Sequence, residues 1–468
     1  MTFTNGRSST DARPTVLFVC HNHPKVRPGG AEAYALELHR HLLGTGDVNP
    51  VFLAKGGPPL STAGRAHLGT YIAPIDRHPN EYFCFTEDWD YDWTFGTIPA
   101  DKRLYTKHLR AFLRAVKPDV VHLHHTMFFG YDILREIRNS VPDAPIVYTL
   151  HEFMPICHRQ GQMLRVPDDE PCMEESPRRC HECYPDISQQ TFFMRKRFIQ
   201  SHLELVDRFI APSRFLGDRY VDWGLPAEKV IVEEYGRTMP AVEPAEVARR
   251  RHRDRFAFFG QLTPFKGLQV VLEAVALLRR NGAPEGDPLL AALERAAGPR
   301  AAPDAADEAG PDPHVRVYGA NLDLQPGPFQ NRINDLLGQT RDSVTFVGKY
   351  DHDALPSLMA DVDWVIVPSI WWENSPLVIQ EAFHFGRPVI CSDIGGMAEK
   401  VTDGVNGLHF RANHPPSLAA VMEDAAGDPA LWERLRRGIR PAHPMREHAQ
   451  RMLSLYGELL GREVASHA

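Results

Sequence analysis

The sequence predicts an α/β protein made of two doubly wound, Rossmann-like domains in tandem. Short apolar segments rich in β-branched residues alternate with amphipathic helical segments over most of the chain. Strands that are apolar throughout are typical of a parallel sheet covered by helices on both faces. The alternation stops at Pro240–Arg253, a charged stretch rich in Pro, Ala and Arg, and then resumes. With 468 residues, the chain is long enough for two such domains, each with its own core.

The first domain is expected at residues 14–240. Helices are predicted between most of its strands, and the clearest amphipathic patterns lie at Ala31–Leu43 and Lys102–Val116. The strands are predicted at Thr15–Cys20, Asn49–Ala54, Asp119–His124, Pro145–Leu150, Arg208–Pro212 and Lys229–Tyr235.

The second domain is expected at residues 250–440, with a solvated insertion at 281–313 that is rich in Ala, Pro, Asp, Glu and Gly. Ligands of two such domains usually bind in the cleft between the carboxyl edges of their sheets, so we expect the functional residues there. The strands are predicted at Arg255–Gln261, His314–Tyr318, Ser343–Gly348, Asp363–Pro368 and Arg387–Ser392, and the helices at Gly267–Arg280, Phe329–Leu337, Leu355–Ala360 and Pro376–Phe385.

The composition argues against several classes of protein. The chain has 52 Lys and Arg residues against 60 Asp and Glu residues, a formal net charge of −8, which argues against a nucleic-acid partner. No apolar stretch approaches the ~20 residues of a membrane span, and Met1–Pro14 lacks the apolar segment of a secretory signal. We therefore expect a cytoplasmic protein whose cysteines are reduced.

Gly29 and Gly30 follow the first predicted strand and precede a helix. Glycines at such a turn let the backbone approach a ligand, and the N–H groups at a helix N-terminus favour an anion. A tight turn without a ligand explains the pair equally well. The dinucleotide fingerprint G-x-G-x-x-G is missing here, which argues against a nicotinamide-dependent enzyme.

The segment from Pro368 to Glu381 carries a stronger signal. Ser375 is predicted as the N-cap of a helix with Pro376 in its first turn, so that amides at the helix start can bind a phosphate. Glu373 lies just before this helix and Glu381 lies two turns into it. Ionised carboxylates accept hydrogen bonds from a diol, so the two glutamates suit a sugar–diphosphate–nucleoside ligand. The alternative is a pair of solvated surface charges.

Lys266 lies at the start of another predicted helix, at the end of the segment Phe258–Gly267. The helix macrodipole disfavours a cation at this end. A cation there is useful if it neutralises a bound diphosphate. The alternative is a solvated lysine.

These motifs resemble those of the retaining family-4 glycosyltransferases, nucleotide-sugar-dependent enzymes of the GT-B fold. They appear in the order found in the family and extend over about Thr15 to Phe410. The segments that carry the resemblance are Gly29-Gly30-Ala31-Glu32, Tyr148-Thr149-Leu150-His151-Glu152, Ala211-Pro212-Ser213-Arg214-Phe215, Gly260-Gln261, Lys266-Gly267, Pro368-Ser369, Glu373-x7-Glu381-Ala382, Gly386-Arg387-Pro388-Val389, Gly395-Gly396-Met397-Ala398-Glu399 and Asp403-Gly404-Val405-Asn406-Gly407.

The resemblance implies transfer of a hexose-type sugar, with retention, from a nucleotide diphosphate sugar to a glycan, lipid-linked or small-molecule acceptor, without a catalytic metal. It implies two domains that face each other across a cleft, with the acceptor in the N-terminal domain and the donor in the C-terminal domain. Residues 441–468 are expected to pack back toward the N-terminal domain. The alternatives are a sugar-nucleotide epimerase or phosphorylase on the same fold, and a non-catalytic, zinc-organised module that binds sugar nucleotides.

Matched position by position, the resemblance implies that Glu373, His151 and Lys266 are catalytic. Glu373 would contact the hydroxyls of the donor sugar, His151 would contact that sugar near its anomeric carbon, and Lys266 would bind the diphosphate. The donor-binding residues, with Glu381 at the ribose, would be Gly29, Gly30, Gln261, Lys266, Asn374, Ser375, Pro376, Leu377, Glu381 and Arg214.

Gln261 is the one departure from the family pattern, which usually has an arginine at this position. Glutamine donates hydrogen bonds to phosphate but carries no charge. The diphosphate site is therefore either weaker or completed by Arg214 or Arg27.

His122, His124 and His125 close a predicted strand at the cleft edge. No carboxylate partner for a metal site is evident beside them. They are predicted to line the acceptor side or to pack in the core.

Cys157, Cys172, Cys180 and Cys183 lie in a loop at residues 151–186 that interrupts the strand–helix alternation. The spacing C-x14-C-x7-C-x2-C suggests a structural tetrahedral zinc site, while free thiols, labile disulfides and an iron–sulfur cluster stay open. The other cysteines, Cys20, Cys84 and Cys391, are predicted to be buried as small apolar side chains.

Thr191–Leu203 mixes aromatic residues with a basic triplet on a helical pattern. Such a helix suits contact with an anionic membrane surface, as a lipid-linked acceptor would require. The alternative is a helix packed on the core with a solvated basic face.

Overall fold

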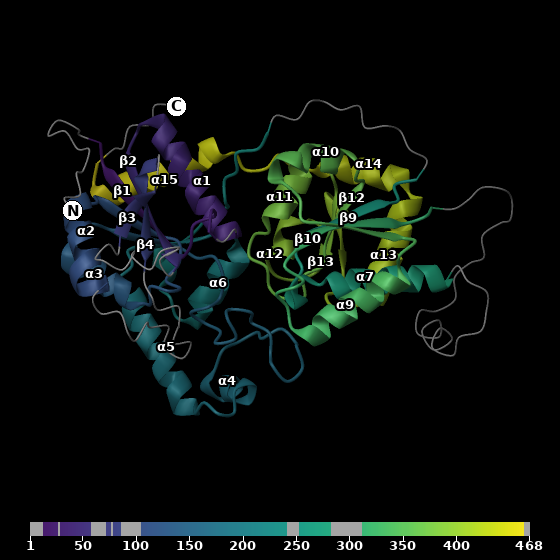
Figure 1. Ribbon diagram of the computed structural model, residues 1–468, viewed down its shortest axis with the longest axis horizontal. Coiled ribbons are helices and arrows are strands. Elements are labelled where there is room, and N and C mark those ends of the chain that lie inside the picture. The colour runs from purple at the N-terminus through teal and green to yellow at the C-terminus, as the bar shows by residue number, and fades with distance from the viewer. Residues whose placement is uncertain are drawn as a thin grey trace, which may run out of the picture. The chain divides into compact units, whose positions relative to one another are not determined.

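The computed structural model describes residues 13–26, 29–57, 72–75, 78–85, 104–240, 252–281 and 311–462. The chain divides into two compact units: unit 1 comprises Met1–Thr238 and His443–Ala468, and unit 2 comprises Met239–Ala442. Each unit is a sheet flanked by helices, so the predicted α/β class is confirmed (Figure 1). Arg27 and most of the predicted linker and insertion lie outside the described residues.

Unit 1 contains an eight-stranded sheet in the order β3-β4-β2-β1-β5-β6-β7-β8. The strands are β1 (Thr15–Cys20), β2 (Asn49–Gly57), β3 (Ile72–Ile75), β4 (His78–Phe85), β5 (Val120–Leu123), β6 (Ile146–Thr149), β7 (Arg208–Ala211) and β8 (Val230–Val232). All neighbours are parallel except β3, which pairs antiparallel with β4 at one edge. The prediction of a purely parallel sheet is wrong at this edge, because β4 mixes polar and apolar residues and gives no buried-strand pattern.

The helices of unit 1 follow the predicted alternation, with one difference. They are α1 (Gly30–Thr45), α2 (Arg110–Val116), α3 (Asp132–Ser140), α4 (Pro177–Cys183), α5 (Gln189–Leu203), α6 (Arg214–Trp223) and α15 (Met445–Leu460). The helix predicted at Lys102–Val116 is an α-helix only from Arg110, because Leu104–Leu109 forms a π-helical turn.

The last helix, α15, packs on unit 1 although the chain reaches it through unit 2. The Tyr34 hydroxyl of α1 lies 2.6 Å from His448 Nε2, and His122 Nδ1 of β5 lies 2.7 Å from the Tyr456 hydroxyl. All four side chains are buried. The C-terminal helix is therefore part of the core of unit 1.

Unit 2 contains a six-stranded, all-parallel sheet in the order β11-β10-β9-β12-β13-β14. The strands are β9 (Arg255–Gln261), β10 (His314–Ala320), β11 (Val344–Gly348), β12 (Trp364–Val367), β13 (Val389–Ser392) and β14 (Gly407–Phe410). The helices are α7 (Leu268–Asn281), α9 (Gly327–Gln339), α10 (Leu355–Ala360), α11 (Leu377–His384), α12 (Gly395–Lys400), α13 (Pro415–Gly427) and α14 (Pro429–Gly438).

The core of unit 2 fixes the helices that follow its central strands. Val365 of β12 and Val389 of β13 pack in one apolar cluster with Ile379 of α11 and Met397 of α12. This packing places the starts of α11 and α12 beside the carboxyl ends of β12 and β13, the edge at which parallel sheets usually bind ligands.

Candidate functional site

The carboxylate of Glu373, in the loop between β12 and α11, is held by three side-chain donors among the described residues of unit 2. Its Oε1 atom accepts hydrogen bonds from Lys266 Nζ at 2.5 Å, Ser369 Oγ at 2.7 Å and Trp371 Nε1 at 3.0 Å. Glu373 is 6% exposed, and Lys266 Nζ also lies 5.7 Å from the centre of the Trp371 ring. The structure thus brings together two of the three residues predicted to be catalytic and fixes the position of the carboxylate.

Glycines let the neighbouring loops pack against this carboxylate loop. Gly267, with φ +75°, lies so close to the backbone that an added Cβ would stand 1.9 Å from the Pro368 carbonyl oxygen. Gly396 N donates to the Glu373 carbonyl at 2.7 Å, and a Cβ on Gly396 would stand 1.7 Å from the Asn374 carbonyl oxygen. Side chains at these two positions would displace the loop that carries Glu373.

The prediction that Ser375 caps α11 is wrong. Pro376 is the N-cap residue and the helix begins at Leu377, so the Ser375 side chain stands one position outside the cap. The Ser375 hydroxyl is buried and has no hydrogen-bond partner among the described residues. No side chain caps α11, so the N–H groups of its first turn remain suited to an anion.

Glu381 and Gln261 lie on elements that adjoin this loop. Glu381 is buried on α11, next to Ala382 in the core of unit 2. Gln261 is the last residue of β9 and is exposed. The assignment of Glu381 to a ribose and of Gln261 to a diphosphate stays a prediction.

We expect the substitution Gln261→Arg to tighten binding of a nucleoside diphosphate by about fivefold, the effect of one added charge-assisted hydrogen bond of ~1 kcal/mol. Calorimetric titration with the diphosphate and with the matching monophosphate measures the change. Gln339→Arg, which adds the same charge at the exposed end of α9, is the control. Equal affinities of the Gln261→Arg protein and the wild type would mean that this residue does not face the diphosphate.

In unit 1, histidines and carboxylates gather where β1, β5 and β6 end. His21 Nε2 lies 2.9 Å from Glu32 Oε1, and His125 Nε2 lies 3.1 Å from Glu152 Oε1. The rings of His21 and His125 are 4.5 Å apart. Because His125 Nδ1 accepts a hydrogen bond from Met127 N at 2.9 Å, its Nε2 carries the proton and donates to Glu152.

Sequence reasoning did not select Glu32, Glu152 and His21 as site residues. All three follow the carboxyl end of a strand or lie in the first turn of the helix after it. Because ligands of parallel sheets bind at this edge, their position in the strand–helix alternation could have identified them as site residues. Glu152 is the most exposed of the four cluster side chains, at 17%.

Gly29 and Gly30 lie at the start of α1, as predicted. The side chain of Glu32, however, lies at the same helix start, where the phosphate was predicted to bind. Gly29 is the N-cap, and a Cβ there would lie 2.4 Å from Glu32 Oε2. Burial alone would raise the pKa of Glu32, but the hydrogen bond and charge of His21 outweigh it and lower that pKa. An ionised carboxylate thus already lies at the positive end of α1.

His151 lies in a chain of buried rings. Its Nδ1 lies 2.6 Å from the Tyr235 hydroxyl and its Nε2 lies 3.2 Å from His124 Nδ1. Burial, followed by the charge of His125, lowers its pKa well below the usual value, so His151 is neutral at neutral pH. The predicted contact between His151 and a donor sugar would have to displace one of these two partners.

The remaining predicted residues of unit 1 differ in their surroundings. His122 bonds through both ring nitrogens, to Tyr456 and to Thr149 Oγ1 at 2.7 Å, which is a packing role. His124 is buried, and its Nε2 has no hydrogen-bond partner among the described residues. Arg214 is the first residue of α6 and is exposed.

The predicted basic face on Thr191–Leu203 is wrong in the first residue of its basic triplet. Arg195 of α5 is buried and donates to the carbonyl oxygens of Met154 at 2.7 Å and Pro155 at 2.9 Å. Lys196 pairs with Glu175 at 3.0 Å. In the described ranges no helix is both long and apolar enough to cross a membrane.

The seven cysteines, all among the described residues, form no disulfide. Cys20, Cys84 and Cys391 are buried, as predicted. In the described part of the chain, only Glu233, His443 and His448 bring three potential metal-ligating atoms within 4.8 Å of one another. The four clustered cysteines are half-buried and do not reach that spacing.

Two family models match the chain, one in each half. Residues 28–232 match the model described as Glycosyltransferase Family 4, and residues 243–441 match the model described as Glycosyl transferases group 1. The D-inositol 3-phosphate glycosyltransferase of Jonesia denitrificans is 25% identical over an aligned length of 451 residues, and the alignment covers 92% of this chain and 92% of that one. The alpha-D-kanosaminyltransferase of Streptomyces kanamyceticus is 30% identical over 117 residues, 25% of this chain and 30% of that one.

Solved structures match both units at low identity. The HepE protein of Anabaena, in complex with UDP and glucose, matches with a TM-score of 0.60 and 16% identity over 95% of this chain and 100% of that chain. The sucrose-phosphate synthase of Thermosynechococcus elongatus matches with a TM-score of 0.63 and 18% identity over 96% and 100%. At such identities the likeness shows the fold, which is GT-B.

Proposed function

Because the chain belongs to the family-4 glycosyltransferases, retaining enzymes that transfer a sugar from a nucleotide sugar, we propose that its donor is a nucleoside diphosphate hexose bound in unit 2. The observation that carries this proposal is the carboxylate of Glu373, fixed by three donors that include Lys266. A fixed carboxylate orients sugar hydroxyls, and a lysine beside it meets the adjoining diphosphate.

The chemistry that these residues support is stabilisation of a leaving diphosphate. As the bond between the sugar and the diphosphate breaks, negative charge grows on the phosphate oxygens. Lys266 and the N–H groups at the start of α11 would stabilise that charge in a preorganised way. The buried hydroxyl of Ser375, which no described residue engages, is a further donor at the same helix start.

Lys266 and Glu373 pair with each other, so the two charges of the proposed site neutralise one another. A bound diphosphate would compete with Glu373 for Lys266. A sugar hydroxyl would then donate a hydrogen bond to Glu373 in place of the lysine. Binding of the complete donor thus satisfies both charges, whereas a free diphosphate satisfies only one. We expect the intact donor to gain affinity from its sugar for this reason.

We propose that the acceptor is a hydroxyl compound bound in unit 1, at the cluster formed by His21, Glu32, His125 and Glu152. Glu152 is the most exposed carboxylate of that cluster and is held by His125, which suits it to accept a hydrogen bond from an acceptor hydroxyl. A glycan, a lipid-linked sugar and a small polyol all offer such a group.

Turnover distinguishes this function from its rivals. The purified protein would be screened by thermal shift against uridine, adenosine and guanosine diphosphate glucose, and release of the nucleoside diphosphate would then be measured with the stabilising donor and a panel of acceptors. Release that depends on an acceptor, with an α-linked product from an α-linked donor, is the expected result. Binding without release would favour the non-catalytic module, and a changed sugar on the intact nucleotide would favour an epimerase.

The two glutamates of the E-x7-E segment are expected to respond differently to substitution. Glu381→Ala should mainly raise the donor KM and weaken binding of the free nucleoside diphosphate, because a ribose contact is the same in the ground and transition states. Glu373→Ala should lower kcat by about 100-fold. It should leave diphosphate affinity unchanged or increased, because Lys266 loses its competing partner.

Donor kinetics and calorimetric titration on both variants measure these effects, after circular dichroism shows that each variant folds. Loss of diphosphate affinity in Glu373→Ala, with loss of turnover alone in Glu381→Ala, would mean that the donor lies in the opposite orientation. Wild-type behaviour of both variants would overturn the proposed donor site.

A further inference from the structure

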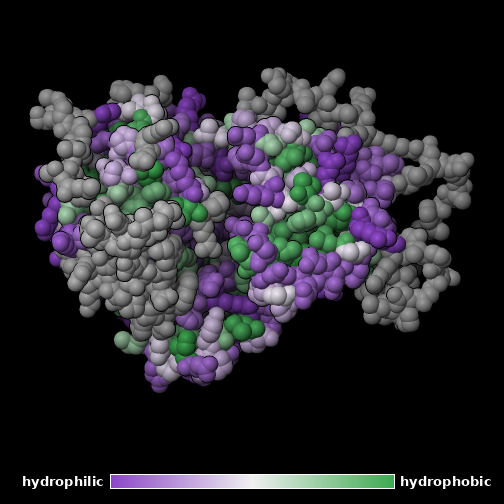
Figure 2. Space-filling view, in the orientation of Figure 1, coloured by the Kyte–Doolittle hydropathy of each residue, from purple (hydrophilic) through white to green (hydrophobic). Residues whose placement is uncertain are grey.

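The segment between β6 and α5 contains a folded lobe in which Met163 and Leu164 are the buried apolar side chains. We call residues 157–187 the cysteine lobe. No residue from 165 to 191 is buried as a whole, although the Glu175 side chain is only 5% exposed. The backbone is nevertheless ordered by turns and by α4, whose cap Ser176 accepts a hydrogen bond from Arg179 N at 3.3 Å. In Figure 1 α4 lies beside α5 and away from the strands of unit 1, and in Figure 2 the surface of this projection is a mixture of polar and apolar patches.

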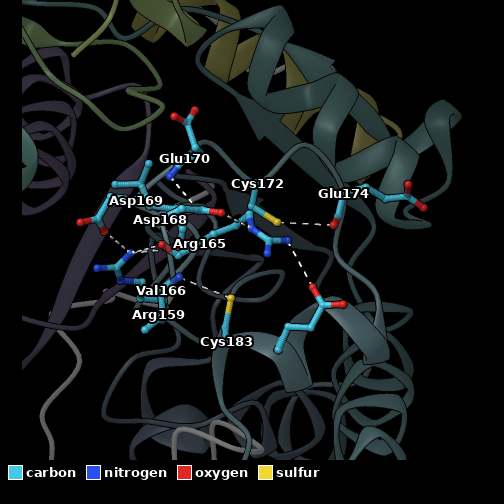
Figure 3. A network of polar contacts seen from close by, with 11 residues as sticks. Arg159, Arg165, Val166, Asp168, Asp169, Glu170, Cys172, Glu174 and Cys183 are labelled. Atoms are coloured by element: carbon cyan, nitrogen blue, oxygen red, sulfur yellow. Dashed lines mark hydrogen bonds and ion pairs between the residues drawn. The ribbon is translucent and has the colours of Figure 1, made fainter. Parts of the chain in front are cut away.

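The polar contacts of the lobe are too weak to replace a core. Arg159 pairs with Asp169 at 2.8 Å, and Arg165 pairs with Asp168 at 3.2 Å and with Glu182 at 3.4 Å (Figure 3). The three carboxylates are each about half exposed, and such pairs contribute about 0–1 kcal/mol. A small structure with so few buried apolar side chains usually needs a covalent or metal cross-link.

Four thiols are the one strong cross-linking chemistry that the lobe contains. Cys157, Cys172, Cys180 and Cys183 are half-buried and unoxidised. All four lie within 27 consecutive residues of one lobe. Thiolates brought together in this way bind a divalent cation, and binding couples to the folding of the segment that carries them.

Cys172 and Cys183 both belong to the network of polar contacts in Figure 3. Val166 N donates to Cys183 Sγ at 3.5 Å, and Cys172 Sγ lies 3.4 Å from the Glu174 carbonyl oxygen. A backbone N–H that donates to sulfur is a typical outer partner of a metal-bound thiolate. To share one ion the four sulfur atoms must come closer than in this structure, where no three of them lie within 4.8 Å of one another.

We propose that Cys157, Cys172, Cys180 and Cys183 bind one structural Zn²⁺ ion. Four thiolates with a C-x2-C pair form the closed, tetrahedral ligand set of structural zinc sites. The ion ties α4 to the turn that follows β6 and so supplements the few buried apolar side chains of the lobe. Four protein ligands leave no open position for substrate, so this ion takes no part in the transfer.

The site is connected to the carboxylate cluster of unit 1 through a short turn. Cys157 N donates to the Phe153 carbonyl oxygen at 2.7 Å, and Glu152 accepts a hydrogen bond from Met154 N. Arg195 holds the carbonyl oxygens of the same turn. Loss of the ion is thus expected to loosen the turn that places Glu152.

Metal analysis of the full-length chain tests the site. The protein purified without added metal should contain about one zinc ion per chain, and the Cys180→Ser/Cys183→Ser variant should contain about a tenth of that or less. Cys391→Ala in unit 2 is the matched control and should keep the zinc. Cobalt substitution should give the thiolate-to-metal absorption band of a tetrahedral sulfur site. Iron in place of zinc, or no metal in the wild type, would overturn the proposal.

A second variant separates this site from the other potential ligand group. His443→Ala removes one of the three ligands at Glu233, His443 and His448. It should leave the zinc content unchanged. Zinc that is lost from His443→Ala and kept in the double cysteine variant would place the ion at Glu233, His443 and His448, and would overturn the proposal.

A proteolysis measurement covers the case in which the cysteine variant does not fold. A strong chelator added to the wild-type protein should increase trypsin cleavage after Arg165, Arg178 and Arg179 by about tenfold or more, while peptides of unit 2 stay protected. Unchanged cleavage of a protein from which zinc has been removed would contradict a structural role for the ion. These readouts do not depend on glycosyl transfer.

Discussion

Lys266→Ala is expected to lower kcat/KM for the sugar nucleotide by about 100- to 1,000-fold, the usual effect of removing one preorganised charge from a transition state. Lys266 is the cation that the structure holds beside the carboxylate of Glu373. Its loss removes the charge that meets the leaving diphosphate. Steady-state kinetics with the preferred donor measure the effect.

Two further variants make this result specific. Lys349→Ala removes an exposed lysine elsewhere in unit 2 and should keep wild-type kinetics. Lys266→Ala leaves the buried Glu373 without its counter-charge, so its melting temperature should fall. The double variant Lys266→Ala/Glu373→Ala should regain part of that loss without regaining activity. Activity of Lys266→Ala within threefold of the wild type would overturn the assignment of this residue to the diphosphate.

Acid is expected to unfold unit 1 before unit 2. In the described ranges, the histidines whose pKa is lowered from the usual value, with burial as the largest cause, all belong to unit 1: His21, His23, His39, His41, His122, His124, His151 and His448. The pKa is lowered to about 4 for His39 and to about 3 for His122.

The sign of the effect follows from proton binding. Histidines of the unfolded chain bind protons near pH 6.5, whereas these buried rings stay neutral to lower pH. Below about pH 6.5 the unfolded state therefore binds more protons, and the free energy of unfolding falls by about 1.4 kcal/mol per pH unit for each such histidine. The loss begins near pH 6.5 and, for His39, continues to about pH 4.

Thermal unfolding between pH 7.5 and 4.5, followed by hydrogen exchange of peptides from each unit, measures this difference. The variant His39→Phe replaces a ring that packs between Phe18 and Phe52 and lies outside the proposed site. It should reduce the pH slope of unit 1 by about 1.4 kcal/mol per pH unit. Earlier unfolding of unit 2, or equal stability of unit 1 at pH 7 and pH 5, would contradict the prediction.

The fold was predictable where most residues of a strand are buried. The ranges predicted for β1 and β9, Thr15–Cys20 and Arg255–Gln261, are the observed ones. An apolar, β-branched or aromatic run between turn residues leaves few alternatives for such a segment. β4 was missed because only two of its eight residues are buried, and its mixture of polar and apolar residues then resembles a loop.

The candidate site was predictable in its residues and only partly in its arrangement. Glu373 and Lys266 could be selected because each follows a strand and precedes a helix. Their mutual pairing could not be predicted, since it joins residues 107 positions apart and depends on glycines that let two loops pack. The cap of α11 was misassigned because Ser and Pro at neighbouring positions both suit the start of a helix, and tertiary packing decides between them.

The placement of α15 has a consequence for how this protein is made. His122 of β5 meets Tyr456 across 334 residues of sequence, and all of unit 2 is translated between them. On the ribosome, unit 2 can complete its sheet while unit 1 still exposes the surfaces of α1 and β5 that α15 later covers. Unit 1 is synthesised first, but its core is completed last. A chain that ends before α15 therefore lacks part of the core of unit 1.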